Sequence, residues 1–444
     1  MKIVILGAGN TGSYVASVLS QEQHDITLID CNAKALDQIN RESDVATVLA
    51  TMPNLQALSN VIERKPDLFF AATNNDETNL VSCSLAKNLG IPKTVARINS
   101  SSLLQSGLLD IGRLFYVDHF IGAEILSAQD LFKLLIHSSD LAFESFAHGA
   151  VLMRTIVIPS IWKKGGVPIK DLQLPLGLIV GVIRRDKEIF FPHGDDCILP
   201  GDEATLIGEA KIMDALHEYF HTQERRVKSV ILVGGTDVAL HLARLLLQQR
   251  VSVRIIEKDA ARCKELSDLL PAATILNRNQ EESSFLRDEG VESVNALVCC
   301  AKNDGANLLI SSMAVHLGCP KVISLIGDPS YIPLFEKARV TPALSVRINV
   351  ANRLLSILHE KTILSVGSIS NDAVKIVELK VSPASELIGI PLQALSLPED
   401  LLIAVIENKG KVVIGRGDSI LCPDDTAIVI CSSHCLEQNY HLFQ

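Results

Sequence analysis

Three glycines and a carboxylate near the start of the chain have the types and spacing of a phosphate-binding loop. A short apolar run, Ile3–Leu6, leads directly into a loop whose six residues are Gly7, Ala8, Gly9, Asn10, Thr11 and Gly12. Asp30 closes the next apolar run, 23 residues after the first glycine. In such a loop the first glycine allows a tight turn, the second lets the backbone approach a pyrophosphate, and the third lets a helix pack close to the sheet. The pattern predicts a nucleotide site.

The residues around the loop indicate which nucleotide it would take. A helix is expected to start at Asn10, and the backbone N–H groups of Asn10 and Thr11 would then point at the phosphates. Asp30 can accept hydrogen bonds from both ribose hydroxyls and would repel a 2′-phosphate. NAD(H), ATP and ADP are therefore favoured over NADP. The alternative is a sheet of this type that has lost its ligand.

Further polar residues follow the later strands of the same segment. Thr73 and Asn74 come after the fourth expected strand, at the sheet edge where open parallel sheets bind ligands. Arg97 ends the fifth strand; it could hold a phosphate bidentately or form a structural ion pair, and both alternatives stay open. Asp76 and Asn79 could cap the helix that starts there, and capping is the favoured role for Asp76.

The same pattern returns in the second half of the chain in altered form. Gly234 follows an apolar run, and Glu257 stands 23 residues later as the counterpart of the ribose-binding carboxylate. Thr236 occupies the place of the second glycine, where its Cβ would crowd a pyrophosphate. Leu325 stands opposite Arg97. The second site is therefore expected to be weaker, altered in ligand choice or empty.

Short apolar runs alternate with helical patterns over the first 118 residues, which indicates a doubly wound parallel sheet. Strands are expected at Ile3–Leu6, Ile26–Ile29, Ala46–Leu49, Leu68–Ala72, Thr94–Ile98 and Leu114–Val117. Helices are expected at Thr11–Ser20, Ala33–Arg41 and Asn79–Leu89. The two halves correspond closely, since the pair Asn75-Asp76 recurs as Asn303-Asp304, 228 residues later.

The remaining segments complete a two-fold repeat of a large and a small domain. Residues 119–138 have the pattern of an amphipathic connecting helix. Residues 140–222 and 363–444 have short strands and tight turns, and each is expected to form a small α+β domain. A charged linker, Gln223–Lys228, separates the halves, and residues 228–346 form the second nucleotide-binding domain. The predicted fold class is α/β, with two Rossmann-like sheets that are each followed by a small domain.

The composition excludes several classes of protein. The chain has 444 residues, 48% of them hydrophobic, and a net charge of −10, so a nucleic-acid partner is not expected. No apolar run reaches the roughly 18 residues that a membrane helix needs. The ten cysteines include no C-x-x-C pair. Cys431, His434 and Cys435 have a spacing unusual for zinc, so no metal is expected.

The order of these motifs resembles the Trk-type potassium-uptake regulatory proteins (TrkA), a family of tandem RCK/KTN domains. The resemblance rests on the glycine loop, Asp30, the run Thr73–Asn79, Ala96-Arg97 and Asp118-His119. It also rests on the Gly-Asp and Asp-Asp turns that end both small domains. The resemblance extends over essentially the whole chain, because the same order of motifs occurs in both halves.

The resemblance implies a cytoplasmic protein that is peripheral on the inner face of the cell membrane. Its partner would be a Trk-type potassium-transporter subunit, whose activity it would set through bound NAD(H), ATP or ADP. It would assemble as a homo-oligomer, a dimer or a tetramer. Two alternatives remain: an NAD-dependent oxidoreductase, for which no acid–base residue is evident, and a scaffold that the nucleotide merely stabilises.

Overall fold

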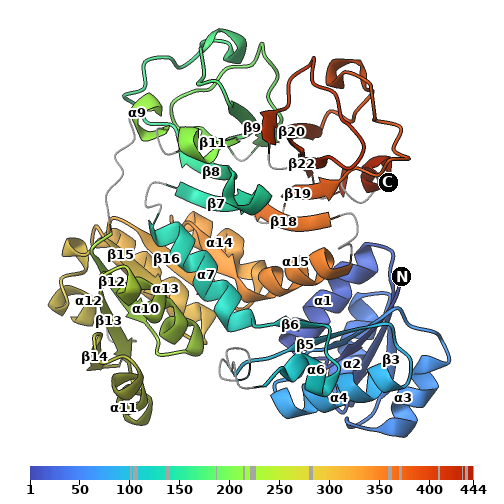
Figure 1. Cartoon of the computed structure of the whole chain (residues 1–444). Helices are drawn as coiled ribbons and strands as arrows, with labels where there is room; N and C mark the ends of the chain where they lie inside the picture. Colours follow the sequence, from blue (N-terminus) through green and yellow to red (C-terminus); the bar gives the residue numbers. More distant parts are fainter. Residues whose placement is uncertain are drawn as a thin grey trace.

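The structure is a computed structural model that shows two large parallel sheets and two smaller antiparallel sheets (Figure 1). It describes residues 1–100, 103, 109–136, 140–186, 188–213, 216–220, 227–279, 284–358, 363–369, 373–408, 411–432, 434–435 and 439–443. The expected α/β fold class, a Rossmann-like sheet and a small domain in each half, is confirmed.

The first parallel sheet has the strand order β3-β2-β1-β4-β5-β6. Its strands are β1 Lys2–Leu6, β2 Asp25–Asp30, β3 Ala46–Leu49, β4 Leu68–Ala71, β5 Lys93–Arg97 and β6 His119–Ile121. Helices α1 (Asn10–Gln21) and α2 (Ala33–Glu42) pack on one face of this sheet. Helices α3 (Leu55–Ile62), α4 (Asp76–Asn88) and α6 (Ile111–Phe115) pack on the other. This arrangement places the loop after β1 at the point where the strand order reverses, which is where such sheets bind ligands.

The second parallel sheet repeats this order as β14-β13-β12-β15-β16-β17. Its strands are β12 Ser229–Val233, β13 Ser252–Glu257, β14 Thr274–Asn277, β15 Ala296–Cys299, β16 Val322–Ile326 and β17 Ala343–Ser345. Its helices are α10 Asp237–Gln248, α11 Ala260–Leu269, α12 Ser284–Asp288, α13 Asp304–His316 and α14 Ile332–Lys337. The central strands β1, β4, β12, β15 and β16 are almost wholly apolar and buried, as parallel strands covered on both faces require.

The end of the first sheet differs from the expectation. The strand predicted at Leu114–Val117 is wrong, because Leu114 and Phe115 lie in the short helix α6 and the next two residues lie in no strand. The Asp110 side chain accepts a hydrogen bond from the backbone N–H of Arg113 and so caps this helix. Tyr116, with φ of 54°, ends it in a left-handed conformation. The helix-capping residue Asp110 and the helix-ending residue Tyr116 are close in sequence, and together they favour a short helix over the strand that the apolar pattern predicts.

The connecting helix begins later than predicted. Residues 119–121 form the edge strand β6, which pairs in parallel with β5, and helix α7 runs over Ala123–Ile136. Two apolar segments of different type follow one another here without a break, so the apolar pattern alone could not separate them. The last two residues of the predicted helix, 137 and 138, lie outside the described residues.

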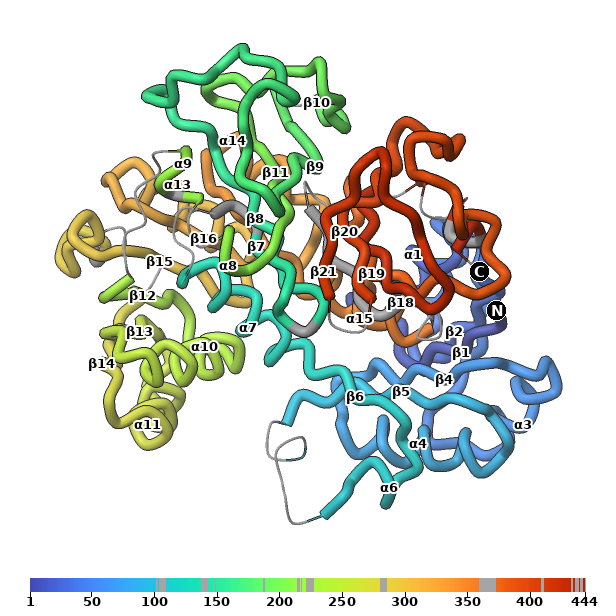
Figure 2. The backbone as a smooth tube through the Cα atoms, turned by 45° about the horizontal axis from the view of Figure 1, so that its top comes forward, coloured from blue at the N-terminus to red at the C-terminus, as the bar shows by residue number. Residues whose placement is uncertain are grey.

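The two halves exchange the helices that follow their parallel sheets. Helix α7 from the first half packs against α10 of the second sheet, and α15 (Val346–Leu358) from the second half packs against α1 of the first (Figures 1 and 2). Four residues of α7 belong to the core of the second nucleotide domain: Ala128, Leu131, Leu134 and Leu135. Six residues of α15 belong to the core of the first: Val350, Ala351, Leu354, Leu355, Ile357 and Leu358. Each nucleotide domain is therefore completed by the other half of the chain.

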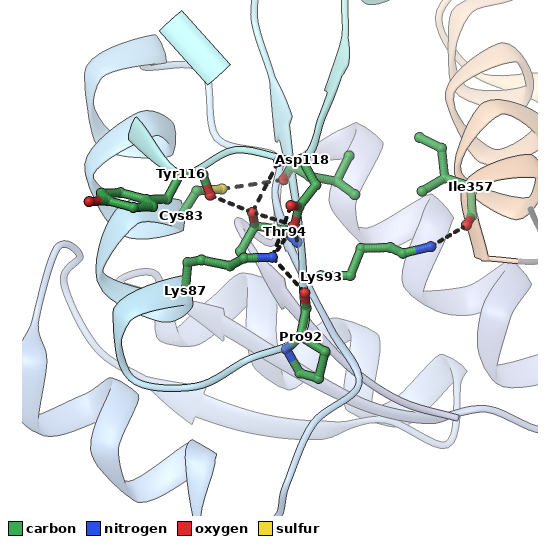
Figure 3. Close-up of polar contacts among 9 residues, drawn as sticks. Cys83, Lys87, Pro92, Lys93, Thr94, Tyr116, Asp118 and Ile357 are labelled. Atoms are coloured by element: carbon green, nitrogen blue, oxygen red, sulfur yellow. Dashed lines mark hydrogen bonds and ion pairs between the residues drawn. The ribbon is translucent and has the colours of Figure 1, made fainter. Parts of the chain in front are cut away.

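Equivalent lysines hold the ends of the exchanged helices. Lys93 Nζ donates to the carbonyl oxygen of Ile357 at 3.0 Å (Figure 3), and Lys321 Nζ donates to that of Leu134 at 2.7 Å. A cation at a helix C-terminus also interacts favourably with the helix dipole. The repeated Leu-Gly-x-Pro-Lys segment of the sequence thus secures the helix that arrives from the opposite half.

The neighbouring polar cluster fixes the edge of the first sheet (Figure 3). Lys87 Nζ lies 2.6 Å from an Asp118 carboxylate oxygen, which also accepts the backbone N–H of Thr94 at 2.7 Å. Burial alone would raise the pKa of Asp118, but the hydrogen bonds and charge of Lys87 and the donors of Thr94 outweigh burial and lower it. The cluster links α4, β5 and the residue before β6.

One apolar cluster contains residues of both small domains, in addition to a cluster within each. The first sheet, in the order β10-β9-β11-β8-β7, consists of β7 Asp140–Phe146, β8 Val151–Val157, β9 Leu178–Arg185, β10 Glu188–Phe190 and β11 Glu203–Glu209. The second, in the order β18-β19-β22-β20-β21, consists of β18 Ile363–Ile369, β19 Val374–Lys380, β20 Leu401–Asn408, β21 Lys411–Ile414 and β22 Thr426–Ser432. Ile430 packs so closely on Gly181 that a Cβ there would overlap it. The two halves of the chain are therefore joined both at the nucleotide domains, through the exchanged helices, and at the small domains, through this shared cluster.

Candidate functional site

The first glycine loop has the geometry that its sequence predicts. Gly7 has φ of +105°, and a Cβ there would lie 3.1 Å from the backbone nitrogen of Thr73. A Cβ on Gly12 would overlap the carbonyl oxygen of Gly7. A Cβ on Gly9 would meet nothing within 4 Å. The outer glycines are thus required by the fold, whereas the freedom of Gly9 leaves space above the backbone that a ligand could occupy.

The helix that follows this loop has an open N-terminus. Gly9 is the N-cap residue of α1 and makes no side-chain cap, and the first turn contains no acidic residue. Gly9 and Asn10 are exposed, while Thr11 is buried. The first turn of a helix leaves backbone N–H groups without partners inside the helix, and these favour an anion. Asn10 and Thr11 lie in this first turn, and phosphate binding by their backbone N–H groups stays a prediction.

Asp30 holds the loop from the end of β2. One carboxylate oxygen accepts the backbone N–H of Ala8 at 2.6 Å, and the other accepts that of Asn32 at 2.7 Å. A carboxylate has about four acceptor positions, so both oxygens can still accept ribose hydroxyls. Asp30 therefore has a structural role that the sequence did not reveal, and ribose binding by Asp30 stays a prediction.

Thr73 and Asn74 lie at the end of β4, as predicted. The Thr73 hydroxyl donates to Asn79 Oδ1 at 2.6 Å, and the buried Asn79 amide also donates to the carbonyl oxygen of Arg97 at 2.8 Å. Asn79 thus ties the end of β4 to the end of β5 and does not cap a helix. Asn74 is exposed at the sheet edge.

The structure places Arg97 in an ion pair. Its guanidinium Nη2 lies 3.2 Å from Glu124 Oε1 at the start of α7, and Nη1 lies 3.4 Å from Asn74 Oδ1. This is the second of the two roles left open by the sequence. A contact of Arg97 with a phosphate stays a prediction.

The favoured role of Asp76 as a helix cap is wrong. Asn75 is the N-cap residue of α4, and its side chain accepts the backbone N–H of Thr78 at 2.6 Å. The Asp76 carboxylate instead accepts the backbone N–H groups of Asn99 and Ser100, at 2.9 and 2.8 Å. Asp304 binds the corresponding loop of the second half in the same way. The repeated Asn-Asp pair is therefore structural in both halves.

The second loop has the same backbone but a closed helix N-terminus. Gly234 has φ of +99°, and Glu257 accepts the backbone N–H groups of Gly235 and Asp259 at 2.6 and 2.9 Å. Thr236 Oγ1 accepts the N–H of Ala239 and caps α10, while it donates to a neighbouring carbonyl oxygen. The Thr236 side chain thus lies at the helix N-terminus and takes one backbone N–H group, that of Ala239, that a phosphate could otherwise use.

A residue that the sequence reasoning missed covers the second loop further. Arg262 donates from Nε to the carbonyl oxygen of Gly235 at 2.6 Å and pairs with Asp237 at 2.7 Å. Asp237 also places a negative charge in the first turn of α10, where a phosphate would bind. Asp237 stands in place of Asn10, and Arg262 stands in place of Ala35. These two differences between the halves are the features of the sequence that could have indicated a covered second loop.

The cysteine-rich end of the chain shows no metal-binding arrangement in the described part of the chain. There, no group of three or more His, Cys, Asp or Glu residues could hold an ion. Cys431 is buried in β22, and burial raises the pKa of its thiol. Burial also raises the pKa of Cys435, to about 11. Both sulfurs are thus neutral thiols near pH 7.

Comparison with known proteins shows where this chain belongs. It matches the TrkA-N domain over residues 3–109 and 230–346, and the TrkA-C domain over residues 165–221 and 376–444. It is 31% identical over 437 residues to the "Trk system potassium uptake protein TrkA homolog 1" of Methanosarcina mazei, which covers 97% of each chain. The chain belongs to the TrkA family. Both glycine loops of this TrkA-family chain lie in TrkA-N matches.

Solved structures agree with the TrkA-family fold. The GsuK RCK domain matches with a TM-score of 0.65 at 15% identity, covering 99% of this chain and 94% of that one. The GsuK channel bound to NAD matches with a TM-score of 0.64 at 14% identity, covering 100% of this chain and 78% of that one. At these identities the similarity establishes the tandem RCK fold.

Proposed function

We propose that this chain is the nucleotide-binding regulatory subunit of a Trk-type potassium uptake system. It would act on the cytoplasmic, inner face of the membrane and gate a separate potassium-transporting subunit. The names of its relatives support the assignment to such a system. In the part of the chain that the structure describes, no helix is both long and apolar enough to cross a bilayer. This fits a subunit whose partner supplies the membrane path.

The observation that carries the proposal is the open, uncapped N-terminus of α1 beside Asp30. The space above Gly9, the free backbone N–H groups and the carboxylate of Asp30 together fit a phosphate joined to a ribose, as in a nucleotide. NAD(H) is the proposed ligand, with ATP and ADP binding at the same site. We assign no catalytic residue, since the site's polar groups bind and position but include no acid–base pair.

Gating would follow from differential binding. A nucleotide shifts the arrangement of the domains only if it binds one arrangement more tightly than another. A complete switch needs a preference of about 5.5 kcal/mol, which several cooperating sites can supply. The exchanged helices α7 and α15 provide a route, because each links one nucleotide domain to the core of the other.

Equivalent apolar faces on both nucleotide domains support a homo-oligomer, either a dimer or a tetramer. Helix α4 packs beside α6, and α13 packs beside α14. The exposed apolar side chains on these faces are Val81, Leu114 and Tyr116 in the first domain, and Leu309, Tyr331 and Leu334 in the second. Exposed apolar groups on matching faces favour association between copies of the chain.

A charged residue on this face should weaken assembly. We expect Leu114→Asp to shift the protein to smaller species at equal concentration, with association at least about tenfold weaker, because a desolvated carboxylate would be costly at an apolar contact. Light scattering coupled to gel filtration measures this. The matched control is Leu176→Asp, since Leu176 is 78% exposed on a loop of the small domain. An unchanged mass for the Leu114 variant would contradict the proposed face.

The nucleotide assignment is tested by a pair of matched carboxylate variants. Asp30→Asn should weaken NADH and ATP binding by about 10- to 100-fold, because charge-assisted hydrogen bonds to the ribose are lost. Glu257→Gln removes the same loop-holding charge from the closed second site and should leave binding unchanged. Titration calorimetry and nucleotide-dependent potassium uptake are the measurements. Wild-type protein that binds no nucleotide would overturn the proposal and favour a scaffold.

A further inference from the structure

Three charged side chains meet where the first small domain packs against helix α7 (Figure 1). Lys133 Nζ lies 3.1 Å from Asp130 Oδ1 on the same helix and 3.2 Å from Glu144 Oε2 in strand β7. We name Asp130, Lys133 and Glu144 the junction cluster. Two carboxylates share one ammonium group here, so the cluster has a net negative charge when all three groups are ionised.

The junction cluster lies at a contact between several parts of the molecule. Helix α7 packs against β7 of the first small domain and also against α15. From α15, Asn349 Nδ2 donates to Asp130 Oδ2 at 2.9 Å. Other residues of α7 belong to the core of the second nucleotide domain. A change in the charge of the cluster therefore acts on the contact between the first small domain and the paired nucleotide domains.

The other charged groups on the surrounding elements contact different partners or water. On α15, Arg347 forms an ion pair outside the cluster and Arg353 is exposed. On α10, burial and the charge of Arg244 lower the pKa of His241, which is therefore neutral near pH 7. The remaining charged groups with partners outside the cluster are Arg154, Asp237, Lys321, Lys375 and Glu378.

The two carboxylates hold a proton more readily here than they would in water. They lie within about 6 Å of each other on either side of Lys133, a distance at which like charges disfavour joint ionisation. Burial raises the pKa of Asp130, and burial with the charge of Asp130 raises the pKa of Glu144; Lys133 opposes both shifts without cancelling them. The side chains of Asp130 and Glu144 are still 27% and 31% exposed, so protons can reach them from water.

We propose that the junction cluster is a proton-operated clamp that tightens the contact between α7 and the first small domain as the pH falls. When this contact opens, the carboxyl groups return to water and to their ordinary proton affinity. The packed arrangement binds a proton more tightly than the open one, so a falling pH stabilises it. The effect begins near the raised pKa values and is complete below the ordinary carboxyl value of about 4.

The clamp adds an input to the proposed function that needs no nucleotide. When α15 and β18 are aligned with α7 and β7 on their first residues, Arg353 stands in place of Asp130 and Gly367 in place of Glu144. The second half therefore lacks the carboxylate pair, and the response to pH arises at the first small domain.

Hydrogen–deuterium exchange of residues 140–146 in the nucleotide-free chain tests the clamp. After correction for the intrinsic pH dependence of exchange, wild-type protection should rise by about twofold or more from about pH 8 to about pH 6. Asp130→Asn should show the higher protection at both pH values, because the neutral amide removes the repulsion and leaves Lys133 paired with Glu144. Glu144→Gln should behave in the same way, with Lys133 paired with Asp130.

Asp195→Asn is the matched control in the same small domain. Asp195 pairs with Lys170 at the surface, and the hydrogen bond and charge of Lys170 lower its pKa, so this variant should keep the wild-type response to pH. Wild-type protection that does not rise as the pH falls would overturn the inference. A full response to pH in either Asp130→Asn or Glu144→Gln would also overturn it. Both results leave the proposed nucleotide site untouched, because no nucleotide is present.

Discussion

A Gly9→Thr variant should lose nucleotide binding by about a hundredfold or more while its thermal stability is unchanged or slightly raised. The substitution places in the first loop the residue that closes the second. A Cβ at Gly9 meets no protein atom within 4 Å, so the fold accepts it. The threonine hydroxyl would cap α1 as Thr236 caps α10; its side chain would fill the space above the loop and take a backbone N–H group of the first turn. Titration calorimetry and a thermal melt together measure both effects.

The reverse substitution is the control for this experiment. Thr236→Gly removes the cap of α10, but Arg262 and Asp237 still cover the second loop. We therefore expect this variant to bind nucleotide as the wild type does, with one nucleotide per chain. Wild-type affinity in the Gly9→Thr variant would show that the phosphates do not bind at this helix.

A Leu354→Ala variant should destabilise the first nucleotide domain, although Leu354 belongs to the second half of the sequence. Leu354 is fully buried in the core cluster that also contains residues of β1, β4 and α1. Removing a buried leucine side chain costs about 2–5 kcal/mol through lost burial and the cavity left behind. Hydrogen–deuterium exchange should show the loss of protection in residues 1–98, measured against a chemical denaturation curve of the whole chain.

The equivalent change on the other exchanged helix gives the opposite pattern. Leu131 in α7 is fully buried in the core of the second nucleotide domain. Leu131→Ala should therefore loosen residues 229–345 and leave the first sheet protected. If each variant loosened only the half of the sequence that contains it, the helices would not be exchanged in solution.

Much of the fold could be predicted from the sequence because its signals are local and occur twice. Apolar runs of strand length, separated by helical patterns, mark most strands of the first sheet. The glycine loop is equally local, since Gly7, Gly9 and Gly12 act on their own backbone and on the strand beside them. Thr236 stood out because it breaks a pattern that the first half supplies.

The features that the sequence did not reveal depend on contacts between distant residues. Arg262 covers a loop 27 residues before it, and neither residue type alone indicates that contact. The backbone-holding roles of Asp30 and Asp76 are likewise invisible in the sequence, because acceptors of backbone N–H groups carry no pattern of their own. Helices α7 and α15 would have the same apolar faces whichever half of the chain they packed against. The apolar periodicity therefore predicts that these faces are buried, but it does not predict which sheet buries them.

The repeated segment of the sequence does not coincide with the segment that forms one complete nucleotide domain. Residues 1–118 contain all six glycine-loop positions and five strands of the first sheet, yet the face that α15 covers would be open to water in such a fragment. A complete nucleotide domain is assembled from two pieces more than 200 residues apart. Each half of the chain thus supplies a helix that completes the core of the other half, as in a dimer whose two subunits have been fused into one chain. Such a fusion fixes the pairing of an open site with a closed one, so every molecule carries one of each, an asymmetry that two identical subunits could not maintain.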